Sequence, residues 1–150
     1  MADFFLQAAI EEAKAGAADS GIPIGSVLVI DGVIAGRGHN KRVQVNNPIL
    51  HAEMACLANA GRLTWRDYRR ATLYSTLSPC DMCAGAILLY QIPRVVIGEN
   101  RTFRGPEEYL KSRGVSLEVR DNEECYRLMK DFIVKHPDIW NEDIGLPIQT

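Results

Sequence analysis

The sequence lacks long hydrophobic runs, a biased composition and any internal repeat. No apolar stretch approaches the roughly 20 residues of a membrane-spanning helix, so we expect no membrane segment. The first residues include acidic side chains and no positively charged leader, which predicts a cytoplasmic protein. With 47% hydrophobic and 24% charged residues, the composition argues against disorder, collagen-like repeats and coiled coils. A length of 150 residues fits one globular domain covering residues 1–150.

A basic excess is also missing. The net charge is −2 and the isoelectric point about 5.9, whereas nucleic-acid binders usually carry positive charge to contact phosphates. The segment 62–70 departs from this balance, because four arginines alternate there with Trp65 and Tyr68, and it could grip a single strand. A solvated loop with long side chains lying on the surface is the simpler interpretation, so we expect no nucleic-acid partner.

Cysteines are few. In a reducing compartment the four of them are not expected to form disulfides. Cys56 and Cys125 lie inside apolar helical patterns, where cysteine usually behaves as a small buried hydrophobe. Cys80 and Cys83 are different, because their spacing of three residues puts both thiols on one face of a helical turn.

The apolar periodicity predicts an α/β layered domain. We expect helices at 3–18, 51–60, 81–90 and 107–113, a last helix capped by Asp121 and ending at His136, and strands at 27–30, 33–35, 73–77, 95–97 and 115–119. Asp31-Gly32 between the first two strands predicts a hairpin, which makes a sheet of about five strands mixed rather than wholly parallel. The helix at 81–90 is apolar on nearly every side and should be buried. The tail 137–150 shows no clear period.

Two helix starts carry the residues of a candidate metal site. His51-Ala52-Glu53 and Pro79-Cys80-Asp81-Met82-Cys83 both follow predicted strands, so they can meet at one end of the sheet. One neutral imidazole and two thiolates balance the charge of Zn²⁺ and leave one tetrahedral position open, as in catalytic zinc sites. The two cysteines alone would also suit a redox pair or half of a structural zinc site.

A structural zinc site would need a fourth protein ligand. His39 is the candidate, but no spacing argument supports it, and His136 ends the last helix. We expect both histidines to be structural. Glu53 instead points to catalysis, because a carboxylate beside a zinc site can take a proton from water and deliver it elsewhere. Residues two apart do not share a helix face, so His51 and Glu53 can both reach the site only if the helix begins there.

His-x-Glu followed by Pro-Cys-x-x-Cys matches the zinc deaminase signature. With these motifs the chain resembles the cytidine deaminase superfamily and, within it, the small cytosine deaminases of the fungal type. The resemblance covers most of the chain and includes Gly36-Arg37-Gly38-His39-Asn40, Val96-Ile97-Gly98-Glu99-Asn100 and the segment from Trp140 to Gly145. It implies a three-layer α/β/α fold, a homodimer, and one zinc ion per subunit held by His51, Cys80 and Cys83.

The resemblance also implies roles for residues around the metal. Glu53 would shuttle protons, Asn40 would hold the polar edge of a base, and Asp143 would contact its amino end. The expected walls and neighbouring backbone are Ile24, Phe103, Trp140, Ala52 and Ser78. The tail from Pro137 onward would close the pocket as a lid, although it could instead cover the core or a dimer seam.

The implied reaction is hydrolytic deamination of a free nucleobase, most simply cytosine to uracil with release of ammonia, in pyrimidine salvage. Ala52 and Asn141 stand where the fungal type carries a glycine and an aromatic residue, so another amino-heterocycle such as isocytosine or guanine is an alternative. A tRNA adenosine deaminase shares the same motifs, but the acidic charge and the apparent lid argue against it. A non-catalytic zinc module conflicts with Glu53 and with the missing fourth ligand.

Overall fold

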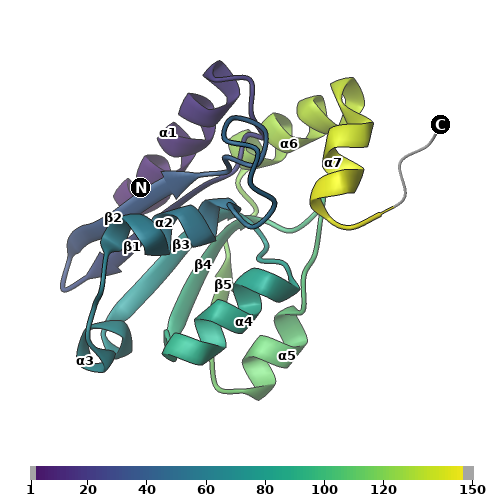
Figure 1. Cartoon of the computed structure of the whole chain (residues 1–150). Coiled ribbons are helices and arrows are strands. Elements are labelled where there is room, and N and C mark those ends of the chain that lie inside the picture. Colours follow the sequence, from purple (N-terminus) through teal and green to yellow (C-terminus); the bar gives the residue numbers. More distant parts are fainter. Residues whose placement is uncertain (1–2, 147–150) are drawn as a thin grey trace.

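The structure, a computed structural model, describes residues 3–146 and has a five-stranded mixed sheet at its centre (Figure 1). The strands are β1 (Gly25–Ile30), β2 (Val33–His39), β3 (Ala71–Leu77), β4 (Arg94–Glu99) and β5 (Ser116–Val119). Their order in the sheet is β2-β1-β3-β4-β5. β1 pairs antiparallel with β2 and β3, whereas β3, β4 and β5 run parallel, which confirms the mixed sheet.

Helices cover both faces of this sheet and make three layers (Figure 1). They are α1 (Phe4–Ala18), α2 (Ala52–Ala60), α3 (Trp65–Arg69), α4 (Asp81–Tyr90), α5 (Glu107–Ser112), α6 (Glu123–Lys135) and α7 (Pro137–Asp143). Alternate strand residues separate two cores: Val27 and Val29 pack with α1 and α6, whereas Leu28 packs with α2, α4 and α5. The expected three-layer α/β/α architecture is confirmed.

The hairpin forms as predicted, but its second strand is longer. Asp31 and Gly32 both have positive φ, which a two-residue hairpin turn of this hand requires. β2 then continues to His39, because Gly36 and Gly38 let α2 lie directly on the strand. A Cβ on Gly36 would be 2.7 Å from the carbonyl oxygen of Cys56, so no larger residue fits there without a shift.

Three segments differ from their sequence predictions. The segment 62–70 contains the short helix α3, which begins at a capping box made by Thr64 and Asp67. The cap of α6 is Asn122 and not Asp121, because the Asn122 side chain accepts from the Cys125 amide at 2.9 Å. The tail is helical over α7, although it showed no period.

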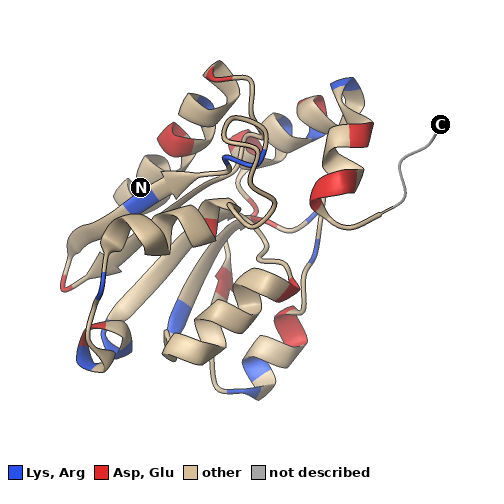
Figure 2. Cartoon of the chain, viewed as in Figure 1, with Lys and Arg blue, Asp and Glu red and all other residues tan. Residues whose placement is uncertain are grey.

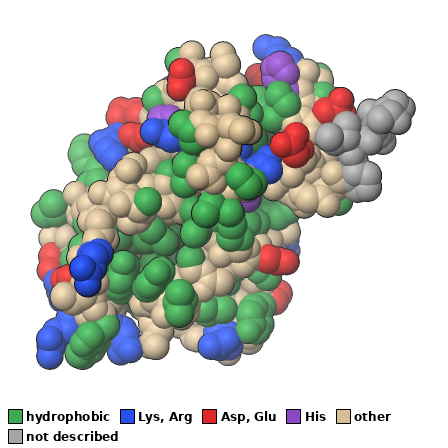
Figure 3. Space-filling model, viewed as in Figure 1, with side chains coloured by type: hydrophobic (Ala, Val, Ile, Leu, Met, Phe, Trp, Pro, Cys, Tyr) green, Lys and Arg blue, Asp and Glu red, His purple; other side chains and the backbone are tan. Residues whose placement is uncertain are grey.

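The prediction that α4 is buried on nearly every side is wrong for its last turn. Leu89 is 70% exposed and Tyr90 is half-exposed, and Tyr109 of α5 adds a further exposed aromatic side chain. Figure 3 shows hydrophobic side chains gathered on this face of the molecule. Charges of both signs are spread over the helices (Figure 2). None of the helices within residues 3–146 is long and apolar enough to cross a membrane.

Candidate active site

The candidate ligands lie at two helix starts beside the C-terminal end of β3. His51 is the N-cap of α2, with an extended backbone, so its side chain lies outside the helix. Cys80 is the N-cap of α4, three residues after β3 ends at Leu77. α2 begins at Ala52, which is the condition that lets His51 and Glu53 reach one site although they are two residues apart.

The donor atoms of this group suit a tetrahedral metal ion. His51 Nδ1 lies 3.3 Å from Cys80 Sγ and 3.7 Å from Cys83 Sγ. Tetrahedral zinc with ordinary bond lengths would separate such a nitrogen and sulfur by about 3.6 Å. The three side chains could therefore hold one zinc ion, and within the described part of the chain no second group of three such ligands comes together.

The other two histidines lie elsewhere. His39 Nδ1 contacts Glu12 Oε1 at 2.9 Å, which links β2 to α1. His136 caps the end of α6, and its ring lies 5.1 Å from that of Phe132. Neither belongs to the His51, Cys80 and Cys83 group. This leaves the metal position with three protein ligands, which is typical of catalytic zinc.

The protons of the ligand group are shared by hydrogen bonds. A hydrogen bond from the Cys83 thiol, helped by one from His51, lowers the pKa of Cys80 to about 4. The same hydrogen bond, together with burial, raises the pKa of Cys83. Burial by itself would lower the pKa of His51, but hydrogen bonds with Asp143 and Cys80 raise it to about 10. Metal binding must therefore displace protons from this group.

Glu53 is a buried carboxyl group beside the ligands. It lies in the first turn of α2 and lines the same cavity as His51 and Cys80. Burial raises the pKa of Glu53 to about 7, although the nearby His51 charge acts in the opposite direction. A carboxyl with a pKa near 7 can both accept and release a proton at neutral pH, which suits general acid–base catalysis.

The cavity next to Glu53 is small and mostly apolar, with a volume of about 20 Å³ for the centres of water-sized molecules, and it is partly open to solvent. It is lined by Ile24, His51, Glu53, Leu77, Ser78, Cys80, Phe103, Trp140, Asp143 and Ile144. Phe103 and Trp140 meet edge to face, with their ring centroids 5.9 Å apart. Trp140 is 5% exposed, so α7 contributes a buried wall to the cavity.

Asn40 and Ala52, two expected base contacts, do not line the cavity itself. Ala52 packs in the apolar cluster that also contains Ile24 and Trp140. Asn40 is fully buried and its amide donates to Asp143 Oδ1 at 3.5 Å. The same Asp143 oxygen lies 3.0 Å from His51 Nε2, so the amide, the carboxylate and the imidazole form one polar chain.

Two charged residues near the site were missed by sequence reasoning. Arg42, in the polar loop before α2, places its Nε 3.3 Å from Asp143 Oδ1 and 3.0 Å from the carbonyl oxygen of Pro48. Glu107 is buried and accepts from the Ser78 hydroxyl at 2.7 Å. Neither position carries a signal in the sequence, because an arginine in a loop and a glutamate in a first helical turn are both usually solvated.

The three-layer fold with a buried carboxyl beside an open His-Cys-Cys group defines a hydrolytic zinc-dependent deaminase. Comparison with known families agrees. The cytidine and deoxycytidylate deaminase zinc-binding region matches residues 1–99, and the chain belongs to that family.

Several known proteins are similar to the chain. A cytosine deaminase of Candida albicans is 50% identical over 141 residues, which covers 93% of this chain and 94% of that one. A tRNA-specific adenosine deaminase of Streptococcus pyogenes is 46% identical over 107 residues, covering 69% of this chain and 67% of that one. A structure from a study of tRNA:A34 deaminases superposes with a TM-score of 0.68 at 28% identity, covering 83% of this chain and 97% of that one.

Proposed function

We propose that this chain acts as a single-domain deaminase of a free nucleobase, converting cytosine to uracil with release of ammonia. The observation that carries the proposal is the buried Glu53 carboxyl, which lines a small cavity together with His51 and Cys80 of the candidate ligand group. The Candida albicans cytosine deaminase supports cytosine as the substrate, because its similarity extends over nearly the whole of both chains.

In the proposed mechanism His51, Cys80 and Cys83 would hold a zinc ion, which when bound makes water acidic enough to react near neutral pH. Glu53 takes a proton from the reacting water and delivers it to the ring nitrogen next to the amino-bearing carbon. A second transfer by Glu53 protonates the amine, so ammonia leaves and a carbonyl remains. Asp143, held by His51 and Arg42, is placed to accept from the amino group, and Asn40 orients Asp143.

The size of the cavity supports a free base over a nucleoside. Trp140 and Phe103 form apolar walls of this cavity, and we propose that they exclude a ribose from the space beside the base. We propose that the segment from Pro137 onward is the lid over the site; its last residues, 147–150, lie outside the described part of the chain. Excluding water behind this lid would strengthen the electrostatic interactions of Glu53 and Asp143.

Ammonia release from a panel of amino-heterocycles tests the function. We expect turnover of cytosine at least tenfold above that of cytidine, isocytosine, guanine and adenine, because the similar Candida albicans protein is a cytosine deaminase. A transfer RNA that contains the target adenosine belongs in the same panel, since tRNA deaminases are among the similar proteins. Equal turnover of cytidine would exclude the closed-lid interpretation. Formation of inosine in the transfer RNA would show that the transfer RNA, and not cytosine, is the substrate.

We also propose that the protein is a homodimer through the exposed apolar face of α4 and α5. Leu89, Tyr90 and Tyr109 are exposed on this face, and Gly85 leaves room for close approach of a second helix. A Leu89→Arg variant should shift the sedimentation coefficient from that of a dimer to that of a monomer. A monomeric wild-type protein would contradict the proposal. Thiol ligands also need a reducing environment, which is consistent with the proposed cytoplasmic location.

A further inference from the structure

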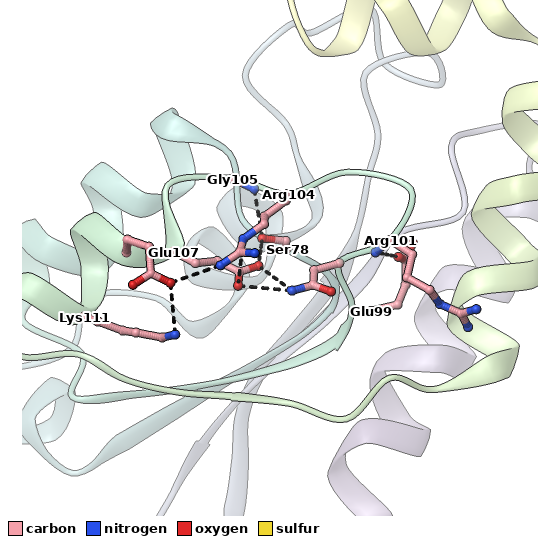
Figure 4. Close-up of polar contacts among 9 residues, drawn as sticks. Ser78, Glu99, Arg101, Arg104, Gly105, Glu107 and Lys111 are labelled. Atoms are coloured by element: carbon pink, nitrogen blue, oxygen red, sulfur yellow. Dashed lines mark hydrogen bonds and ion pairs between the residues drawn. The ribbon is translucent and has the colours of Figure 1, made fainter.

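We propose that Glu107 is a positioning residue of the base site. Its buried carboxylate joins the loop 100–106, which carries the wall residue Phe103, to the segment 78–80, which carries the ligand Cys80. The inference rests on the proposed function, because it assigns Glu107 a part in holding the base-binding walls and the metal ligand in register. Figure 4 shows the polar contacts among Ser78, Gly105 and Glu107.

The hydroxyl of Ser78 uses its single proton in this contact. It donates to Glu107 Oε2 at 2.7 Å and accepts from the Gly105 amide at 3.0 Å. The backbone amide of Ser78 donates to the carbonyl oxygen of Glu99 at 3.1 Å. The side chain of Ser78 therefore joins the neighbouring loop to Glu107, and its position depends on Glu107 and Gly105.

The loop 100–106 also lies directly on the backbone next to Cys80. A Cβ built on Gly105 would be 1.7 Å from the carbonyl oxygen of Pro79, so only glycine allows this approach. Two hydrogen bonds and this backbone contact leave little freedom between the loops. A shift of Gly105 would therefore move Pro79, and with it the thiol of Cys80.

The two oxygens of Glu107 have enough donors to remain buried as a carboxylate. Asn100 Nδ2 donates to Oε1 at 3.2 Å and lies 3.3 Å from Oε2, while Arg104 Nε lies 3.6 Å from Oε1. The residue is 2% exposed, and burying an unpaired charge would cost several kcal/mol. The buried Glu107 carboxylate therefore needs Asn100 and Arg104 as hydrogen-bond and charge partners, and its contacts fix the positions of these two side chains.

A second buried acid holds the other end of the same loop. Glu99 accepts from the amides of Arg101 at 2.7 Å and Thr102 at 3.0 Å. Phe103 lies between these two anchored ends and contacts Trp140 across the cavity. Every polar side-chain contact of Glu107 is made to the loops at the site end of the sheet and none to the sheet itself. Its loss should therefore disturb the site more than the core.

Glu107→Gln tests the inference with almost no change of shape. Glutamine has one acceptor oxygen, so if that oxygen faces Ser78 its amide group faces Asn100, and two donors meet. We expect kcat/KM for cytosine to fall on the order of 10- to 100-fold, with a higher KM, because misplacement of binding groups by about 1 Å has effects of this size. Zinc content, measured by mass spectrometry of the purified protein, should stay near one ion per chain.

Glu108→Gln is the matched control. Glu108 is the next residue of α5, contacts Arg104 at 3.0 Å and is 75% exposed. We expect its kcat/KM to stay within about twofold of the wild type. A double-mutant cycle with Ser78→Ala tests whether Glu107 acts through Ser78. If it does, Glu107→Gln should lower kcat/KM much less in the Ser78→Ala protein than in the wild type.

Hydrogen exchange gives a readout that needs no turnover. In Glu107→Gln the Gly105 amide should exchange faster, whereas amides of β1 and β3 should be unchanged. A lower melting temperature with wild-type kcat/KM and unchanged Gly105 exchange would overturn the inference and leave Glu107 purely structural. If Glu107→Gln does not fold, Asn100→Ala removes one donor of the same network and is judged by the same measurements. If the wild type does not deaminate cytosine, the proposed function fails, while Gly105 exchange still decides the role of Glu107.

Discussion

At the scale of residues, neighbours along the chain have separate tasks. His51 stands outside α2 as its N-cap and offers Nδ1 to the two thiols, while Glu53 lies inside the first turn and turns its carboxyl into the cavity. The start of the helix therefore separates the proposed ligand His51 from the proposed proton carrier Glu53. The same principle applies at α4, where Cys80 is the N-cap and Cys83 lies within the helix.

Glu53→Ala should retain zinc and lose turnover. The expected loss is a factor on the order of 10²–10⁴, which is typical of a general acid–base residue. Cys83→Ala is the contrasting variant, because it removes a ligand and should lose the metal itself. Metal content and ammonia release are measured on both proteins. Near-normal turnover of the zinc-loaded Glu53→Ala protein, or wild-type zinc affinity in Cys83→Ala, would contradict these assignments.

At the scale of elements, polar contacts tie helices to the strand edge that carries the site. Glu12 of α1 accepts from Arg37 Nε at 2.7 Å and contacts His39 at 2.9 Å, both on β2. β2 leads directly into Asn40, which donates to Asp143 of the cavity, so α1 supports this polar contact through β2. Burial acts to raise the pKa of Glu12, but the hydrogen bonds from His39 and Arg37 outweigh it and lower that pKa below its usual 4.5.

This lowered pKa predicts how stability depends on pH. Because the folded pKa of Glu12 is below the unfolded value, its contribution to stability is present above pH 4.5 and is lost as the pH falls through the folded pKa. Glu12→Gln should lower the melting temperature at pH 7 and flatten its decrease below pH 4.5. The melting temperature of both proteins is followed between pH 7 and pH 3. An equally steep decrease in the variant would show that Glu12 is not the group responsible.

At the scale of the whole molecule, charge argues against a nucleic-acid partner even though tRNA deaminases are among the similar proteins. Arginines gather at α3, where Arg66 and Arg69 stack on the exposed Trp65. α3 and the helix starts that carry the site lie at opposite ends of the sheet (Figure 2). A nucleic-acid strand bound at α3 would therefore not reach the cavity.

We expect transfer RNA to bind more weakly than the roughly 10⁻⁶–10⁻⁴ M of nonspecific binders at physiological salt. Filter binding over a range of salt concentrations measures this affinity. An Arg66→Ala, Arg69→Ala double variant serves as the comparison, and it should leave the weak signal unchanged. Tight binding that depends steeply on salt and is lost in the double variant would contradict the expectation.

Many features of this protein's fold and candidate site can be predicted from local sequence patterns without a structure. Alternation and periodicity predict the strands and most helices, because burial of one face imposes a spacing on apolar residues. Motif chemistry predicts the His51, Cys80 and Cys83 group, since one imidazole and two thiolates together balance the charge of Zn²⁺ and leave one tetrahedral position open. The tail showed no period, because its seven-residue helix is held by Trp140 in an apolar cluster and not by an amphipathic stripe.

What the sequence by itself determined is therefore the layered fold, from its apolar periodicity, and the candidate ligands with Glu53, from two short motifs and the family resemblance that they carry. Only the tertiary structure decided which charges are buried, because that depends on contacts between residues far apart in the chain. Arg42 meets Asp143 across about a hundred positions, and Ser78 meets Glu107 across 29. In the sequence these residues look like ordinary solvated groups, and only the closing of α7 and of the loop 100–106 over the strand ends makes them part of the site.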